Sequence, residues 1–134
     1  VIHILEKLIE VTNKYSKLNI NFIAISANNP ETYPADSPEK MKDLAINNNF
    51  CFPYLFDETQ QTAKDYMAAC TPDFYIFDKN KSCVYRGRFD ASTPGNGVDC
   101  TGEDLSNALD NIIRNEPVLS EQHPSMGCNI KWKD

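Results

Sequence analysis

Three segments of the chain carry apolar residues at the three- and four-residue spacing of amphipathic helices. Their apolar faces are Ile2, Leu5, Leu8, Ile9 and Thr12 in the first segment, Met41, Leu44 and Ala45 in the second, and Leu105, Ala108, Leu109, Ile112 and Ile113 in the third. The first helix starts with the sequence itself, and no Ser, Thr, Asp or Asn caps it. Such a start is typical of a helix cut from a longer one.

Capping residues predict where the other helices begin. Ser37-Pro38 supplies an N-cap and a proline at the first helical position of the second helix. Asp57 and Gln60 resemble a capping box, which predicts an additional helix that runs to about Ala69. Thr101 is the expected N-cap of the last helix.

Four apolar stretches predict strands. Residues 19–26 are nearly continuous in apolar character, as in a parallel strand that is covered on both faces. Residues 50–56 are interrupted by Pro53, which favours an edge or irregular strand. Residues 73–78 and 82–88 flank a short polar turn and predict a hairpin.

The order of these elements is helix, strand, helix, short strand, helix, hairpin, helix. Strands that alternate with helices predict an α/β domain with a central mixed sheet flanked by helices, and the late hairpin adds antiparallel strands at one side. A length of 134 residues fits one domain. We expect residues 1–115 to form it and residues 116–134, which lack periodicity, to form a tail that packs on it.

Charge and hydropathy exclude several partners. A hydrophobic share of 41% and a charged share of 24% are ordinary for a globular protein. The net charge of −6 argues against nucleic acid or an anionic membrane as partner. No apolar run is long enough to span a membrane, and no secretory signal is visible. Because the sequence begins with Val1 rather than Met, a leader or a longer N-terminus is still compatible with it.

The five cysteines, Cys51, Cys70, Cys83, Cys100 and Cys128, are widely separated. They form no Cys-x-x-Cys or Cys-x-x-His pair, so we predict no metal site. An odd and sparse set does not suit a disulfide framework. The expected compartment is therefore reducing, which predicts a cytoplasmic location.

The segment Cys70-Thr71-Pro72-Asp73 is the first candidate for chemistry. A proline that follows a helix and begins an apolar strand is a plausible position for a cis peptide bond. Such a bond would turn the Thr71 backbone outward, where its N–H and C=O could pair with an extended partner chain. The alternative is that Pro72 only ends the helix and begins the strand.

An ordered series of short motifs runs through the whole chain. They are Glu31-Thr32-Tyr33-Pro34, Asp36-Ser37-Pro38-Glu39, Phe52-Pro53-Tyr54-Leu55, Asp57-Glu58-Thr59-Gln60, Cys70-Thr71-Pro72-Asp73-Phe74, Tyr85-Arg86-Gly87, Pro94-Gly95-Asn96-Gly97 and Gly127-Cys128-Asn129-Ile130-Lys131-Trp132. In this series the chain resembles the peroxiredoxin-like branch of the thioredoxin superfamily, related to alkyl hydroperoxide reductases and thiol-specific antioxidant proteins. The resemblance implies a thioredoxin-like fold in which Pro72 is a cis-proline that faces the active site.

The resemblance also implies a Cys-x-x-Cys segment that this sequence does not contain. In relatives it lies at the N-terminus of the first long helix, where the helix dipole lowers the pKa of the attacking thiol. Residues 1–4 resemble those that directly follow it, so its strand, expected between residues 19–26 and 73–78, is also missing. Open edges would then remain on both neighbours. Either the sequence omits residues of the native protein, which we favour, or another chain fills the gap.

Cys70 and Cys128 are the candidate accessory thiols of such a redox site. Cys70 would lie beside Pro72 and either pair with the nucleophile or tune it; the alternative is a small buried apolar residue. Cys128, by analogy with resolving cysteines on C-terminal segments, has a redox role. Its alternative is a tail that packs Cys128 and Trp132 against the core. Thr71 and Pro72 are the expected substrate-binding residues.

The other candidates have plainer interpretations. Cys51 and Cys83 are expected in the core, and Cys100 in an exposed loop. His3 could help to acidify a thiol at the start of the first helix, although a solvated side chain is the simpler reading, and His123 is expected to be structural. Arg86 could stabilise a thiolate or a peroxide oxygen, but a surface ion pair is more common for an arginine on a hairpin. The carboxylates Asp57, Asp73, Asp78 and Asp90 are explained by caps and turns.

The resemblance therefore implies a thiol–disulfide oxidoreductase or a peroxiredoxin-like antioxidant domain, with its main redox cysteines upstream of Val1. Its substrate would be a protein disulfide or a peroxide, its electron donor an external thiol, and no cofactor is expected. A homodimer is left open. The alternative is a non-catalytic thioredoxin-fold module that binds a partner through Thr71 and Pro72.

Overall fold

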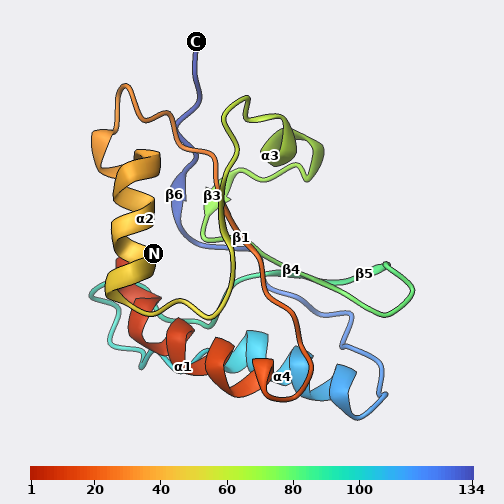
Figure 1. Cartoon of the computed structure of the whole chain (residues 1–134). Coiled ribbons are helices and arrows are strands. Elements are labelled where there is room, and N and C mark those ends of the chain that lie inside the picture. Colours follow the sequence, from red (N-terminus) through yellow and green to blue (C-terminus); the bar gives the residue numbers. More distant parts are fainter.

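The computed structural model describes residues 1–134 (Figure 1). The helical elements are the short 3-10 turn η1 (Ile2–Ile4), α1 (Leu5–Ser16), the 3-10 turn η2 (Pro34–Asp36), α2 (Pro38–Asn47), α3 (Gln61–Asp65) and α4 (Glu103–Ile113). The strands are β1 (Ala24–Ser26), β2 (Tyr54–Phe56), β3 (Cys70–Thr71), β4 (Phe74–Phe77), β5 (Cys83–Gly87) and β6 (Cys128–Asn129). No helix has the length and apolar character that crossing a membrane requires.

The strands form three separate pairs rather than one sheet. β1 and β2 are parallel, with Ile25 opposite Leu55. β4 and β5 form the predicted antiparallel hairpin. β3 and β6 form a short antiparallel ladder. The sequence did not predict this third pair, because two-residue strands carry no periodicity.

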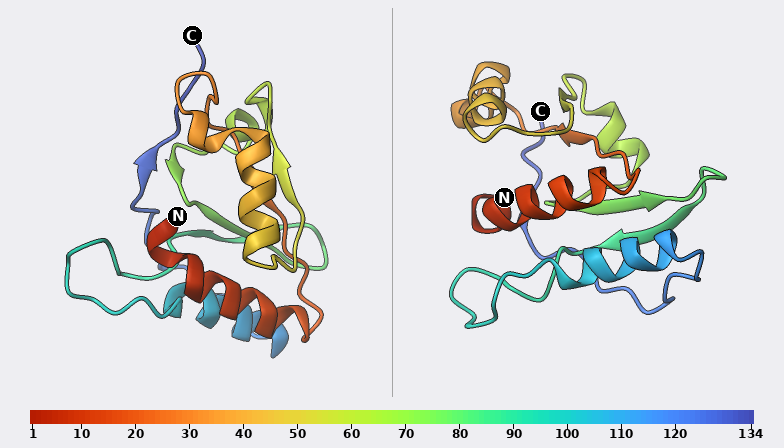
Figure 2. Two further views of the ribbon diagram at one scale, coloured as in Figure 1. Left: turned by 60° about the vertical axis from the view of Figure 1, so that its left-hand side comes forward. Right: turned by 60° about the horizontal axis from the view of Figure 1, so that its bottom comes forward.

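One half of the molecule, which we call the α1/α4 half, consists of α1, α4 and the β4–β5 hairpin. The two helices lie side by side (Figures 1 and 2), and the Tyr15 hydroxyl of α1 donates to the Asp110 carboxylate of α4 at 2.6 Å. The core of this half contains nine buried residues: Ile4, Val11, Tyr15, Ile76, Tyr85, Phe89, Leu105, Ala108 and Leu109. Burial of this apolar surface is the main source of stability here.

The other half, the α2/α3 half, consists of α2, α3 and the β1–β2 pair. Its apolar cluster contains only Ala27, Ala63 and Ile130, and Ile130 comes from the C-terminal segment of the chain. The two halves therefore differ greatly in the apolar core that holds them.

The face of α1 that packs inward differs from the predicted one. Ile2 is 80% exposed, and the buried positions are Ile4, Val11, Thr12 and Tyr15. The buried residues Ile4, Val11, Thr12 and Tyr15, with the partly buried Leu8, keep helical spacing, so the inward face is a neighbouring stripe of the same helix that shares Leu8 and Thr12 with the predicted one. The start of the helix has no side-chain cap, as predicted.

The predicted caps have mixed outcomes. The Ser37 hydroxyl accepts from the Lys40 N–H at 3.3 Å, which confirms the cap of α2. The predicted capping box is wrong: α3 has five residues, and Gln60 adopts a left-handed backbone conformation before it. At α4 the N-cap residue is Gly102 rather than Thr101, whose hydroxyl accepts from the Glu103 N–H.

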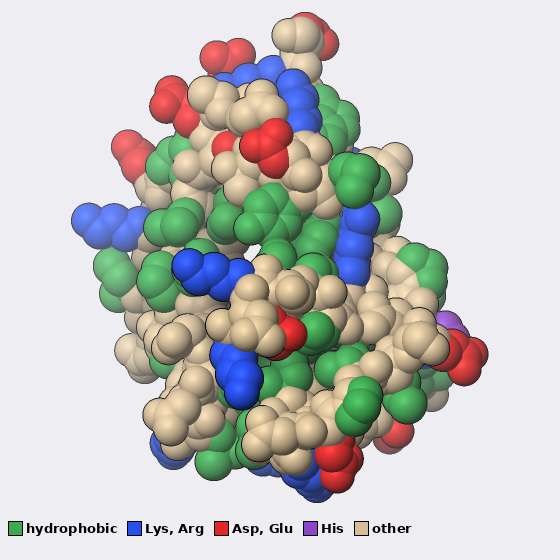
Figure 3. Space-filling view, turned by 90° about the vertical axis from the view of Figure 1, so that its right-hand side faces the viewer, with side chains coloured by type: hydrophobic (Ala, Val, Ile, Leu, Met, Phe, Trp, Pro, Cys, Tyr) green, Lys and Arg blue, Asp and Glu red, His purple; other side chains and the backbone are tan.

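The strand predicted over residues 19–26 is shorter than expected and open on one face. Only Ala24–Ser26 is a strand, and Ile23 and Ile25 are 65% and 47% exposed. Leu55 beside Ile25 is also exposed. β1 and β4 do not pair, so each has an open edge. The face in Figure 3 shows hydrophobic side chains gathered across the middle of the molecule.

Candidate functional site

The candidate site is the β3 segment, Cys70-Thr71, and the proline that follows it. Thr71 lies opposite Cys128 of β6, and Cys70 lies opposite Asn129. The Ile130 N–H donates to the Ala69 carbonyl at 2.9 Å. Hydrogen-bonded and non-bonded pairs alternate along an antiparallel ladder, so Thr71 and Cys128 are the next hydrogen-bonded pair. The Thr71–Pro72 peptide bond is cis. The backbone expected to face a partner chain is thus paired within the molecule.

Cys70 and Cys128 occupy neighbouring positions of the β3–β6 ladder, but their side chains point to opposite faces of it. Residues directly opposite in a ladder share a face, and successive residues alternate between faces. Cys128 therefore shares a face with Thr71, whereas Cys70 shares the other with Asn129. Both thiols are free; Cys70 is partly exposed and Cys128 exposed. This register does not favour a disulfide between them, and neither thiol is a buried apolar residue.

We use the name C-terminal segment for residues 125–133, which carry β6. The Ser125 hydroxyl donates to Asp73 at 2.6 Å, at one end of the segment. Ile130 is buried, with 5% of its surface exposed. Trp132 is 42% exposed and lies near Lys64, so the tail packs Ile130 inward rather than its tryptophan.

Gln60 joins the C-terminal segment to the end of β1. Its side-chain amide donates to the Ala27 carbonyl at 2.6 Å and to the Lys131 carbonyl at 3.0 Å. Its side-chain oxygen accepts from the Lys133 N–H at 2.9 Å. Gln60 is 2% exposed, and all its polar groups have partners. This role needs the fold, and no local pattern in the sequence indicates it.

The Arg86 guanidinium contacts three neighbouring residues, although 41% of its side chain is exposed. Its guanidinium donates to the Met67 carbonyl at 2.7 Å, pairs with Asp73 at 3.3 Å and lies over the Tyr75 ring. Burial, with the carboxylate of Asp73, raises the pKa of Tyr75 to about 12. Arg86 therefore acts as an ion-pair partner, the plainer of its two interpretations.

The positions of the remaining cysteines correct three predictions. Cys51 and Cys83, expected in the core, are exposed. Cys100, expected to be exposed, is partly buried and packs against the core of the α1/α4 half. Burial raises the pKa of the Cys100 thiol, with the Asp90 carboxylate adding to the effect, so this thiol is a poor nucleophile.

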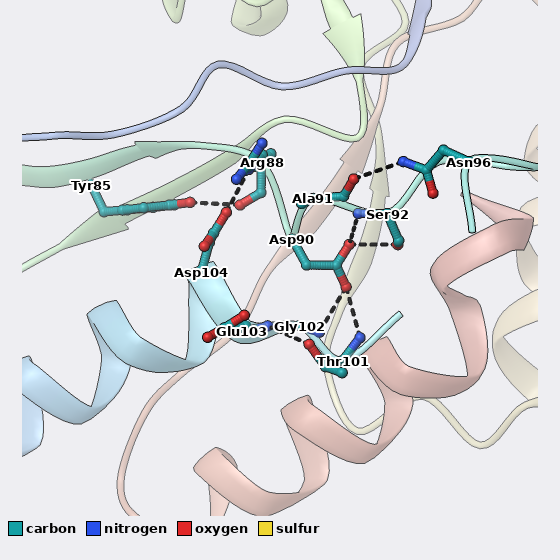
Figure 4. Close-up of polar contacts among 10 residues, drawn as sticks. All are labelled: Tyr85, Arg88, Asp90, Ala91, Ser92, Asn96, Thr101, Gly102, Glu103 and Asp104. Carbon is teal, nitrogen blue, oxygen red and sulfur yellow. Dashed lines mark hydrogen bonds and ion pairs between the residues drawn. The ribbon is translucent and has the colours of Figure 1, made fainter. Parts of the chain in front are cut away.

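Asp90 organises the loop that leads to α4 (Figure 4). Its carboxylate accepts from the N–H and hydroxyl of Ser92 and from the N–H groups of Thr101 and Gly102. Burial alone would raise the pKa of Asp90, but these hydrogen bonds outweigh it and lower the pKa below its usual value. The loop is thereby closed at its base, while Gly95 and Gly97 have no neighbour within 4 Å.

The same loop reaches the start of α1. The Ser92 hydroxyl lies 3.1 Å from Nε2 of His3, so Asp90, Ser92 and His3 form a continuous polar chain. The sequence separates His3 from Ser92 by 89 positions, which is why spacing could not reveal this contact. Next to it, Arg88 pairs with Asp104 of α4, and the Tyr85 hydroxyl donates to the Arg88 carbonyl (Figure 4). The His123 carbonyl accepts from the Arg88 N–H, a backbone contact that does not involve the imidazole ring.

A parallel β–α–β arrangement followed by an antiparallel hairpin and a final helix, with a proline segment leading into β4, defines a thioredoxin-like α/β protein. A family model described as the AhpC/TSA family matches residues 2–86. The chain belongs to the AhpC/TSA family, which confirms the resemblance and the fold predicted from the sequence.

Two solved structures are very similar to this chain. A crystal structure of an uncharacterized conserved protein from Geobacillus kaustophilus has a TM-score of 0.96 and 51% identity, over 99% of this chain and 70% of that one. A hypothetical protein from Sinorhizobium meliloti has a TM-score of 0.97 and 40% identity, over 99% of this chain and 73% of that one. A search of curated proteins finds no match.

Proposed function

We propose that this chain is part of a thiol–disulfide oxidoreductase or peroxiredoxin-like antioxidant domain whose main redox cysteines precede Val1. The observation that carries the proposal is the AhpC/TSA match over residues 2–86, a family in which thioredoxin-like redox function is the rule. We take the cytoplasm as its compartment, consistent with five unpaired cysteines.

The unpaired edges of β1 and β4 support a position of the nucleophile upstream of α1. β1 and β4 both have an open edge, and Ile25 and Leu55 leave one face of the β1–β2 pair uncovered. Parallel pairs are normally covered on both faces. A strand that precedes α1 could pair with these open edges, and it would place a cysteine pair at the start of the helix. There the free N–H groups and the dipole would favour the thiolate.

In the proposed reaction, the upstream thiolate attacks a peroxide or a disulfide. Attack on a peroxide forms a sulfenic acid and releases an alcohol or water; a second thiol then forms a disulfide and releases water. An external thiol reduces that disulfide again. Thr71 and Pro72 form the surface beside the reacting sulfur, and Cys70 and Cys128 are accessory thiols. A peroxide and a protein disulfide are the two candidate substrates, and a homodimer is the candidate assembly.

The test uses the protein with the residues that its gene encodes before Val1. Peroxide consumption and insulin reduction are measured for the native protein and for a variant in which the upstream cysteines are serine. We expect the double variant to lose essentially all activity, and Cys51→Ser, which removes an exposed thiol at another location, to keep it. Equal activity in the native protein and the double variant would contradict the proposal and favour a non-catalytic binding module.

A further inference from the structure

We propose that the C-terminal segment makes this protein selective for small substrates, hydroperoxides and low-molecular-weight disulfides, over disulfides in protein chains. The inference rests on the proposed function and narrows its substrate class. It follows from what lies along β3: the C-terminal segment already occupies the backbone edge that an extended polypeptide substrate would use.

The backbone groups along the edge of β3 that faces β6 already have partners. Thr71 pairs with Cys128, and the Ala69 carbonyl accepts from Ile130 two residues before it. Pro72 has no N–H to offer a further partner. The Thr71 hydroxyl also reaches the Cys128 carbonyl, at 3.5 Å. An incoming chain could form these backbone bonds only by displacing β6.

The contact at Gly127 leaves no room for such a chain to share the edge. A Cβ atom at Gly127 would lie 1.7 Å from the Thr71 carbonyl oxygen and 3.3 Å from the Pro72 nitrogen. Such a separation is far inside van der Waals contact, so only glycine allows the segment to lie this close. Gly127 is the residue that lets the C-terminal segment cover Thr71.

The segment is fastened on both sides of this contact. Ser125 donates to Asp73 before it. After it, Ile130 is buried, and the Lys131 N–H and carbonyl bond to the Asn28 side chain and to the Asn29 N–H. Displacement would break these bonds and leave buried polar groups without partners, which is costly. A protein substrate must meet that cost before it can bind, whereas a small molecule does not need the Thr71 backbone.

Cys128 remains reachable while the segment is in place. Its side chain is exposed and lies on the same face of the ladder as Thr71. A peroxide or a small disulfide can therefore reach the surface beside Pro72 without any movement of the segment. The same geometry excludes an extended chain and admits a small solute.

The main test is the ratio of kcat/KM for insulin to kcat/KM for oxidised glutathione, measured on the full-length protein. Gly127→Val should release the segment and raise this ratio about tenfold. The protein substrate binds only while the edge of β3 is free, so its apparent affinity rises with the fraction of molecules in which the segment is displaced. Gly95→Val is the matched control: it strains a left-handed backbone (φ +82°), but its Cβ would meet nothing within 4 Å and it does not touch the C-terminal segment, so the ratio should stay unchanged. Hydrogen exchange at the Cys128 and Ile130 amides shows whether the segment has been released.

A second variant tests whether the segment is seated in solution, and it does not depend on Gly127→Val folding. Asn129 faces Cys70 in a non-hydrogen-bonded pair, where Cα atoms are close enough for a disulfide. In a denatured thiol count, oxidised Asn129→Cys should therefore lose two thiols more than oxidised Asn129→Ser, because any disulfide of the upstream redox cysteines is common to both variants.

The outcomes separate this inference from the proposed function. A released segment with an unchanged ratio would overturn the selectivity inference while leaving the redox function in place. Oxidised Asn129→Cys protein that loses no more thiols than Asn129→Ser would do the same. Absence of turnover with insulin, glutathione disulfide and hydrogen peroxide alike would remove the proposed function itself, and the inference with it. A tenfold rise confined to the protein substrate supports both.

Discussion

The two halves of the molecule are held together in different ways. The α1/α4 half encloses nine buried apolar residues, and Leu109 and Tyr15 at its centre are each 1% exposed. The α2/α3 half has a cluster of only three buried apolar residues, one of them Ile130 from the C-terminal segment, and its other buried apolar side chains, Met41 and Phe52, lie outside that cluster. Its integrity depends on polar side chains, above all Gln60. The comparison indicates that the first half is held mainly by its apolar core, whereas the second depends more on polar contacts.

The two halves contribute differently to function and to stability. The open apolar face at Ile25 and Leu55 belongs to the α2/α3 half, and the candidate site at Thr71 lies where the C-terminal segment joins the two halves. Substitutions in the α1/α4 half should therefore act on global stability. Substitutions at the ties should act on the position of the C-terminal segment as well.

The largest expected effect is at the centre of the α1/α4 half. Leu109→Ala removes a side chain that is 1% exposed and leaves a cavity, which should lower the free energy of unfolding by about 3 kcal/mol. Ile46→Ala in α2, where the side chain is 61% exposed, is the control and should change it by less than about 0.5 kcal/mol. Urea unfolding followed by circular dichroism measures both. Equal losses would contradict the contrast between the halves.

The second-largest effect is expected when the hydrogen bonds of the Gln60 side chain in the α2/α3 half are removed. Gln60→Ala leaves the Ala27 and Lys131 carbonyls without their shared donor, and the expected loss is about 2 kcal/mol in urea unfolding. Hydrogen exchange at Lys133 should also quicken, since its N–H loses the Gln60 oxygen. Gln61→Ala, the exposed neighbour that bonds only to Asp65, is the matched control and should do neither. Unchanged exchange at Lys133 in Gln60→Ala protein would show that this tie does not hold the segment.

The regular elements of the fold were predictable because their signals are local. Ser37 caps α2, the 73–78 and 82–88 stretches form the hairpin, and the face of α4 contains Leu105 and Leu109 as its period indicates. The AhpC/TSA resemblance, carried by short motifs, then supplied the overall arrangement.

What could not be predicted depends on contacts between distant parts of the chain. The pairing of Thr71 with Cys128 joins residues 57 positions apart, and two-residue strands have no period to detect. Gln60 has the spacing of a capping residue, yet the fold uses its amide to bridge two distant carbonyls. Cys51 and Cys83 lie in apolar stretches but are exposed, since Cys51 lies in a bend before β2 and Cys83 begins β5 beside the hairpin turn. Local hydropathy does not report which face a tertiary neighbour covers.

The smallest of the three effects tests whether the Asp90 carboxylate stabilises its loop through its charge. Asp90→Asn removes a carboxylate that accepts four hydrogen bonds and should lower the free energy of unfolding at pH 7 by about 1.5 kcal/mol. Because the folded pKa of Asp90 lies below its ordinary value of 3.8, its contribution is present above that value and is lost as the pH falls through the folded pKa.

The difference between native protein and Asp90→Asn should therefore shrink below about pH 4, whereas the loss in Gln60→Ala, a neutral tie, should keep its size. Urea unfolding from pH 7 to pH 3 measures both, with Asp99→Asn, at an exposed position of the same loop, as control. A penalty at Asp90 that stays constant over this range would mean that shape rather than charge closes the loop. In that case the hydrogen bonds around Asp90, like those of Gln60, would stabilise the fold without a contribution from charge. The two halves would then differ only in the size of their apolar cores.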